Sequence, residues 1–196
     1  LDAIPLHPTL LQAASDLLNC SHVLLHQAVA WTKHGDDPGT SDESSNSDQR
    51  LHQDFGNNAW VTPPPWDTPD AVAAIVYYSN VRDTGGATAL VPRRGPDDEM
   101  YSDTLNMKLR MPGMGTVPFV NNKSKAEQMM RRLDIDAYEA RKRAYAREVH
   151  TDTAREGSVL FYRLDVWHRG TPVHRDQVRG VHNLVWKRPD ALTMLA

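Results

Sequence analysis

The pair His52 and Asp54 has the residue types and the spacing of a metal-binding motif. Both residues lie on a segment predicted to be a strand, where side chains alternate between faces, so two positions apart they point to the same side. One further histidine would complete a set of two imidazoles and one carboxylate on one face of an iron ion, which leaves the other positions open for substrates. Alone, a His-x-Asp pair is also typical of a strand-end histidine that bonds to a carboxylate in a turn.

His168 is the predicted third ligand. It ends the apolar run Val166-Trp167-His168 and is followed by a turn at residues 169–172. In a jelly roll, a late strand of this kind lies beside the early strand that carries His52. The two segments are therefore expected to bring both histidines to one ion.

Arg179 lies inside the last strand-like run, Val178 to Trp186. A guanidinium buried without a partner is unfavourable, so this residue needs an anion. A bidentate guanidinium suits the far carboxylate of 2-oxoglutarate, whose keto-acid end chelates the iron. Arg175 is the competing arginine, but it lies in the turn of residues 174–177, where it is expected to be solvated, so Arg179 is preferred.

Further residues are candidates for the pocket, and each has a structural alternative. Ile75 and Tyr77 share one face of a predicted buried strand, where they are expected either to line the oxoglutarate pocket or to pack in the core. Thr171, like Arg169, is either a contact of the co-substrate or a turn residue. The candidate substrate-binding residues follow the His-x-Asp motif, and their alternative is a turn with half-buried aromatic rings: Asn57, Asn58, Trp60 and Trp66.

The first half of the chain contains three predicted strands besides the segment of His52 and Asp54. Residues 10–31 are predicted to form a helix and then a strand, and residues 34–50, which are rich in Gly, Pro, Ser and Asp, a flexible surface loop. The run from Ala71 to Ser79 is β-branched and aromatic, which indicates a buried strand. Asp83 to Gly86 is a predicted turn and Ala87 to Val91 the returning strand, so we expect a hairpin.

Residues 95–150 are rich in charge and methionine, and one helix is predicted from about Lys123 to Val149. Because this segment leaves and returns near the expected metal site, it is either a lid that closes over the substrate or a helix packed permanently on the outside. Strands at both ends of the chain then predict a mainly β fold with helical additions, a double-stranded β-helix of the jelly-roll or cupin-like type, in a single domain over residues 1–196. The late strands are Ser158–Tyr162, Val166–His168 and Val178–Trp186.

Composition argues against several classes of function. The 196 residues have a net charge of −3 and a pI near 6.3, so no basic field favours nucleic acid as a partner. Cys20 is the single cysteine, which excludes an internal disulfide and favours the cytoplasm or another reducing compartment. No apolar run approaches the roughly 18 to 20 residues of a membrane span. The chain begins with Leu rather than Met, so we allow for an N-terminal targeting segment that has been removed from this sequence.

Five pieces of the sequence occur together in one order: Leu51–Asp54, Asp83–Pro92, Gly157–Tyr162, His168–Gly170 and Arg179. In this combination they resemble the phytanoyl-CoA dioxygenase family, over roughly residues 50–95 and 155–187. The resemblance implies a double-stranded β-helix oxygenase that uses iron(II), 2-oxoglutarate and O2 and releases succinate and CO2. The chain departs from the family at Pro92-Arg93-Arg94-Gly95, where the family commonly has Pro-Gly-Ser-His, and in its helical insertion, and these departures leave the substrate open.

The expected reaction is hydroxylation of an unactivated C–H bond in a small-molecule or lipid-like substrate. Asp54 supports hydroxylation, because related halogenases replace the carboxylate with a small residue so that chloride can bind. The alternative is a non-catalytic jelly-roll domain that binds a metal or a small acid as a sensor or scaffold. Arg179 argues against it, since a scaffold has no need of an anion-binding guanidinium in its last strand. The sequence leaves the oligomeric state unknown.

Overall fold

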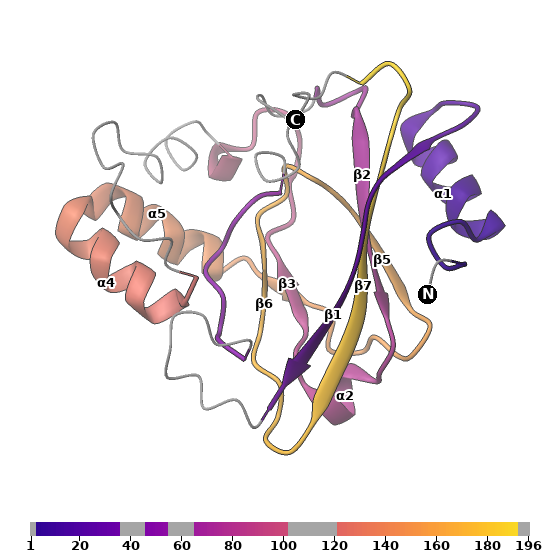
Figure 1. The fold of residues 1–196 in the computed structure, drawn as a ribbon. Helices are drawn as coiled ribbons and strands as arrows, with labels where there is room; N and C mark the ends of the chain where they lie inside the picture. The colour runs from indigo at the N-terminus through magenta and orange to yellow at the C-terminus, as the bar shows by residue number, and fades with distance from the viewer. Residues whose placement is uncertain (1–2, 36–45, 55–64, 102–120, 192–196) are drawn as a thin grey trace.

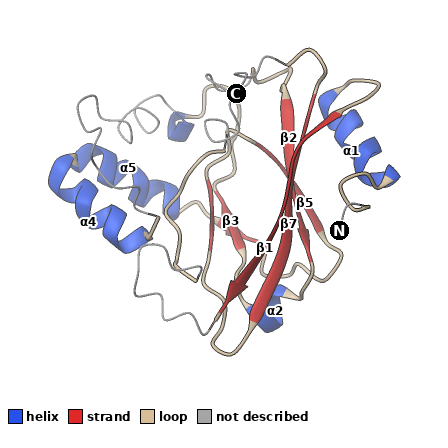
Figure 2. Cartoon of the chain, in the orientation of Figure 1, coloured by secondary structure: helices blue, strands red, loops and turns tan. Residues whose placement is uncertain are grey.

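Two antiparallel sheets face each other in the computed structural model of this chain, which describes residues 3–35, 46–54, 65–101 and 121–191. The large sheet has the strand order β1-β7-β2-β5 and the small sheet the order β4-β3-β6, with the helices on the outside (Figure 1; Figure 2). The helices are α1 (Pro8–Leu18), α2 (Val81–Thr84), α4 (Lys123–Leu133) and α5 (Ile135–Tyr145), with a 3-10 turn η1 (Glu99–Tyr101), and the strands are β1 (Leu24–His34), β2 (Ala71–Tyr77), β3 (Thr88–Leu90), β4 (Val149–His150), β5 (Val159–Arg163), β6 (His168–Gly170) and β7 (Val178–Lys187).

The large sheet is buried on both faces where β2 and β7 pair. Every residue of β2 is buried, as its continuous apolar sequence predicts. Alternate residues point to opposite faces. One face packs against α1 through Val72, Ala74 and Trp186. The other face points into the barrel and carries Ile75 and Tyr77 among its core residues.

The predicted hairpin between residues 71–79 and 87–91 is wrong. β2 pairs with β5 and β7, whereas β3 pairs with β4 and β6 in the other sheet. The turn residues do not reverse the chain tightly, because residues 81–84 form the short helix α2 and Gly85 and Gly86 both have positive φ angles, 70° and 72°. The two strands thus belong to opposite walls of the barrel.

The single helix predicted from about Lys123 to Val149 is also wrong, because the chain contains two helices that meet at Asp134. The backbone of Asp134 is extended, with φ −157° and ψ 94°, and its N–H closes α4 by donating to Met130 O. Its carboxylate accepts from Ala137 N at 3.0 Å and so caps α5. Both helices lie on the side of the small sheet (Figure 1).

Residues 46–50, the described end of the predicted flexible loop, are bonded to the barrel wall, and residues 36–45 of that loop lie outside the described residues. The Asn46 side chain accepts from Val173 N at 2.7 Å, and the Gln49 side chain accepts from Gly170 N at 2.8 Å. The mainly β jelly-roll fold itself is confirmed. No helix in the described ranges is long and apolar enough to cross a membrane.

Candidate metal centre

The structure brings His52, Asp54 and His168 together. One ligand atom from each residue lies within 4.8 Å of the others. His168 Nε2 is 3.2 Å from one carboxylate oxygen of Asp54, and His52 Nε2 is 3.9 Å from the other. The three residues, which lie far apart in the sequence, thus form one cluster with the donor atoms of a two-histidine, one-carboxylate site.

Backbone hydrogen bonds hold the two histidines side by side. His52 N donates to His168 O and His168 N donates to His52 O, both at 3.0 Å, and Asp54 N donates to Leu164 O at 3.0 Å. The segment around His52 thus pairs with β6 through an isolated antiparallel bridge. This pairing sets the spacing of the ligands without any ion.

The ring orientation of both histidines suits metal binding through Nε2. His52 Nδ1 lies 3.1 Å from Arg50 O and His168 Nδ1 lies 2.9 Å from Val166 O. A carbonyl oxygen only accepts, so Nδ1 carries the proton in each ring and Nε2 keeps its lone pair. Burial and the neighbouring His168 lower the pKa of His52 to about 4, which keeps that imidazole neutral near pH 7.

Tyr162 on β5 fixes the carboxylate. Its hydroxyl donates to Asp54 Oδ2 at 2.9 Å from inside the barrel. Burial by itself would raise the pKa of Asp54, but His168, His52 and this hydroxyl hold it well below its usual range. Burial likewise opposes the charged form of His168, and the attraction of Asp54 outweighs it and raises the pKa of His168. Asp54 is therefore held as a carboxylate, the form that binds a metal.

Arg179 is a buried cation without an acidic partner among the described residues. It lies on β7, is 8% exposed, and its Nε has no hydrogen-bond partner. Gly86 packs so closely that a Cβ there would lie 3.0 Å from Arg179 Cδ. Arg175 is exposed in the preceding turn. Of the two arginines, Arg179 is therefore the one in the barrel interior.

Lys33 on β1 lies directly opposite Arg179 in the strand pairing, so the two side chains share the inner face of the sheet. Its ammonium donates to Ser47 O at 2.8 Å and to Thr171 O at 2.7 Å. Burial and the charge of Arg179 lower the pKa of Lys33 to about 8. Two like charges thus face each other in the barrel, where an anion between them would stabilise both.

The other residues predicted for the co-substrate lie nearby, with their polar groups already bonded. The Thr171 hydroxyl donates to Ala87 O at 3.0 Å. The Tyr77 hydroxyl lies 2.8 Å from the hydroxyls of Thr88 and Thr151. Ile75 packs in the inner core. Arg169 points elsewhere and pairs with Glu148 and Asp48.

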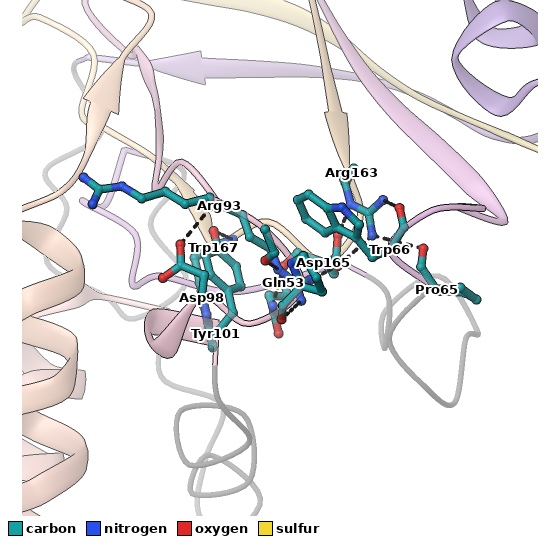
Figure 3. Close-up of polar contacts among 12 residues, drawn as sticks. Gln53, Pro65, Trp66, Arg93, Asp98, Tyr101, Arg163, Asp165 and Trp167 are labelled. Carbon is teal, nitrogen blue, oxygen red and sulfur yellow. Dashed lines mark hydrogen bonds and ion pairs between the residues drawn. The ribbon is translucent and has the colours of Figure 1, made fainter.

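Trp66 is the one predicted substrate-binding residue that the structure describes; Asn57, Asn58 and Trp60 lie outside the described residues. Its ring lies between two guanidiniums, with the Arg93 carbon 5.0 Å and the Arg163 carbon 4.7 Å from the ring centre (Figure 3). Both arginines pair with the buried carboxylate of Asp165. Cation–π contacts and this shared carboxylate hold the ring at the end of the barrel.

The same cluster reaches the metal motif through Gln53, the residue between the two ligands. The Gln53 amide donates to the backbone carbonyl of Asp165 (Figure 3). Arg163 also donates to Trp66 O at 2.8 Å. The ligand segment and Trp66 are therefore fixed to one buried ion-pair cluster.

Sequence reasoning missed Lys33, Tyr162 and Asp165. Lys33 can be found only once the register of β1 against β7 is known. The alternation of Ser158 to Tyr162 places Tyr162 on one face of its strand, but not opposite Asp54. Asp165 follows β5 directly, and nothing in its local sequence distinguishes it from a turn residue.

Comparison with solved structures finds the same fold at low sequence identity. A non-heme monooxygenase, ThoJ in complex with nickel, is 14% identical, with a TM-score of 0.59 over 99% of this chain and 56% of that chain. SnoK, a non-heme alpha ketoglutarate dependent carbocyclase from nogalamycin biosynthesis, is 14% identical, with a TM-score of 0.59 over 98% and 60%. SnoN, an epimerase dependent on the same co-substrate and from the same biosynthesis, is 15% identical, with a TM-score of 0.50 over 94% and 55%.

This chain therefore spans little more than half the length of these three structures. No protein-family model matches it, and neither does any curated protein sequence.

Proposed function

We propose that this chain is an oxygenase domain that uses iron(II) and 2-oxoglutarate. In this proposal His52, Asp54 and His168 hold the iron, and Arg179 with Lys33 binds the far carboxylate of the oxoglutarate. One observation carries the proposal: a preformed two-histidine, one-carboxylate cluster shares the barrel interior with two buried cations, neither of which forms an ion pair with a carboxylate among the described residues.

The donor set fits iron(II). Three protein ligands on one side leave positions for a bidentate co-substrate and for oxygen, whereas a structural zinc site is closed by four protein ligands. Both imidazoles present Nε2, and Tyr162 restrains the second oxygen of Asp54. Such outer contacts fix the orientation of ligands and tune their basicity.

The cation pair fits a dicarboxylic acid. Burying Arg179 without a partner is unfavourable, and a carboxylate would accept from its guanidinium in a charge-assisted bond. Lys33 has two of its three ammonium protons on backbone carbonyls, which leaves the third for the same carboxylate. Lys33 on β1 and Arg179 on β7 would then hold the far carboxylate together.

When bound, iron and 2-oxoglutarate supply the activation of O2 and the coupled decarboxylation that yields succinate and CO2. The residues of the chain bind and orient these groups. Arg179 and Lys33 fix one end of the co-substrate, and Asp54 fills the metal position that a halide would need. We therefore propose hydroxylation of an unactivated C–H bond as the outcome.

The substrate we propose is a small molecule or a lipid-like molecule. Motifs similar to the phytanoyl-CoA dioxygenase family support the lipid-like alternative. The carbocyclase and the epimerase that share the fold act within biosynthesis of a natural product, which supports the small-molecule alternative. Trp66, held by its two arginines, is the proposed aromatic contact of the substrate.

Oxoglutarate turnover tests the proposal directly. Protein reconstituted with iron(II) without oxygen and then exposed to O2 and 2-oxoglutarate should release succinate. His52→Ala and His168→Ala should abolish this release and weaken iron binding sharply, because an incomplete ligand set remains. Full succinate release by either variant would refute the ligand assignment, and metal and oxoglutarate binding without any turnover would favour a sensor or scaffold.

The oxoglutarate assignment has a matched pair of variants. Arg179→Ala should raise the oxoglutarate concentration needed for half-maximal turnover and leave iron affinity nearly unchanged, because it removes a contact to the co-substrate and not to the metal. Arg175→Ala removes the same charge from an exposed turn and should have little effect. A larger effect of Arg175→Ala would show that the assignment to Arg179 is wrong.

A further inference from the structure

A second buried cation lies outside the metal centre, on the other side of the small sheet. Arg141 on α5 is 1% exposed. Its Nη1 donates to Leu51 O at 3.1 Å, whereas Nε and Nη2 have no hydrogen-bond partner. No carboxylate in the described part of the chain forms an ion pair with it. An unpaired guanidinium in such a place is strongly unfavourable, so an anion is expected there.

Trp167 contributes a second orphaned donor beside this guanidinium. It is 2% exposed, and its Nε1 has no hydrogen-bond partner. The Arg141 guanidinium carbon lies 5.5 Å from the centre of its ring. Indole and guanidinium nitrogens only donate, so neither residue can satisfy the other. The pair therefore needs an acceptor.

The described residues around the pair supply no such acceptor to the orphaned atoms. A hydrogen bond with Tyr145 and the charge of Glu127 favour the charged form of Arg141, but neither residue accepts from Nε or Nη2. The ammonium of Lys123 lies 4.0 Å, and the guanidinium carbon of Arg169 5.6 Å, from the centre of the Tyr145 ring. Arg169 is already paired with Glu148 and Asp48, so the unsatisfied donors of Arg141 and Trp167 are what an anion would bind.

We propose that Arg141 and Trp167 bind a small monovalent anion, of the size of chloride, between α5 and the small sheet. Size follows from burial, because the neighbouring core residues Leu51, Ala140 and Ala144 are apolar and leave two donor groups only. Leu51 and Trp167 precede the metal histidines in sequence and point to the opposite face of the sheet. The anion site is therefore separate from the metal site and does not rest on the proposed function.

Chloride-dependent stability tests the site. The metal-free full chain is unfolded by heat in mixtures of chloride and gluconate at constant ionic strength. The midpoint should rise with chloride and saturate, as mass action requires for a ligand of the folded state. Arg141→Met should abolish the rise, and without chloride it should be at least as stable as the wild type, because it removes a buried unpaired charge.

Arg143→Met is the matched control, since Arg143 is an exposed arginine on the same helix. It should keep the full chloride dependence. Trp167→Phe should weaken the apparent chloride affinity about tenfold, the usual effect of one hydrogen bond to a charged group. This variant, together with crystals of the wild type soaked in bromide, also decides the question if Arg141→Met does not fold. A bromide peak in anomalous scattering beside Arg141 and Trp167 is expected.

Three results would overturn the proposal. In the first, the wild type and Arg141→Met show the same chloride dependence, so that the variant differs from the wild type by one constant amount of stability at every chloride concentration. That result indicates a purely structural arginine. In the second, bromide-soaked crystals show no peak at the site. In the third, the stability of the wild type does not depend on chloride, but that of Glu127→Gln does. This result would mean that the Glu127 carboxylate on α4, which acts on the charge of Arg141, takes the place of the anion.

Discussion

The tautomers of His52 and His168 are set by the backbone carbonyls of the residues two positions earlier. Each bond is short-range and needs only the extended conformation of its own segment. The carboxylate of Asp54 is different, because its partner Tyr162 comes from the opposite sheet. The position of the Asp54 carboxylate therefore depends on the contact between the two sheets.

Tyr162→Phe should lower the affinity for cobalt(II) roughly 10- to 100-fold, as the loss of an outer hydrogen bond to a metal ligand usually does. The ring stays in the core, so the change isolates the hydroxyl. Titration followed by the visible cobalt spectrum measures both the affinity and the ligand geometry. Tyr78→Phe, which removes a hydroxyl bonded to His182 at 2.9 Å, serves as control. Equal affinity in Tyr162→Phe and wild type would refute the role of Tyr162.

In the proposed site, Lys33 should make the affinity for oxoglutarate dependent on pH. Its pKa of about 8 means that the ammonium is charged below that pH and loses its proton as the pH rises above it. Oxoglutarate affinity should therefore be constant below about pH 8 and fall above it, while Arg179 stays charged. Calorimetric titration across this range measures the change. Lys33→Met should bind more weakly at every pH and lose the dependence, and a slope retained in that variant would assign it to another group.

The proposed metal ligands and Arg179 could be selected from the sequence because each stands in a recognisable local pattern. Two residues of one strand with a period of two share a face whatever the fold around them. Lys33 and Tyr162 have no such pattern, since their roles come from register and from contact between sheets. Residues such as Lys33 and Tyr162 can be identified only from the three-dimensional structure.

At the scale of elements, the break between α4 and α5 shows why local propensity was insufficient. The amphipathic, charge-rich pattern runs through Asp134 without interruption, so the pattern predicts a single helix. A capping carboxylate and an extended backbone at one residue divide it. The hairpin prediction failed for a related reason, because strand pairing depends on the barrel and not on the glycines of the turn.

Asp134→Ala should destabilise the protein by about 1 kcal/mol, the usual effect of losing an N-cap hydrogen bond. Urea denaturation gives the free energy of unfolding. Asp136→Ala is the matched control, because it removes an exposed carboxylate from the first turn of the same helix without removing the cap. If both variants lose the same stability, the effect is one of charge at the helix N-terminus and not of capping.

At the scale of the whole molecule, the described part of residues 95–150 is packed on the barrel. α5 buries Ala137, Arg141 and Ala144, and its partner residues Leu51 and Trp167 adjoin the metal ligands. We therefore propose that α4 and α5 support the small sheet and do not act as a lid. The lid hypothesis for residues 102–120 concerns residues outside the described ranges.

Removing the metal should leave the fold intact and lower only the melting temperature. The ligand pair is fixed by mutual backbone bonds and Asp54 by Tyr162, so the cluster exists before an ion enters it. Near-ultraviolet circular dichroism should be the same after chelation, and re-adding cobalt(II) at about 100 times its Kd should restore roughly 2.7 kcal/mol. Loss of the tertiary signal on chelation would show instead that folding requires the metal.

The mutual backbone pair of His52 and His168 also bears on the order in which the chain folds. It joins segments that are distant in sequence, and closing such a long loop is slow, because its entropy is lost before the contacts form. Helix α5 forms from contacts that are local in sequence and requires no such closure. In a refolding experiment, the absorbance of bound cobalt should therefore appear after most of the helical circular dichroism signal. The cobalt absorbance then reports the molecules in which the barrel has closed.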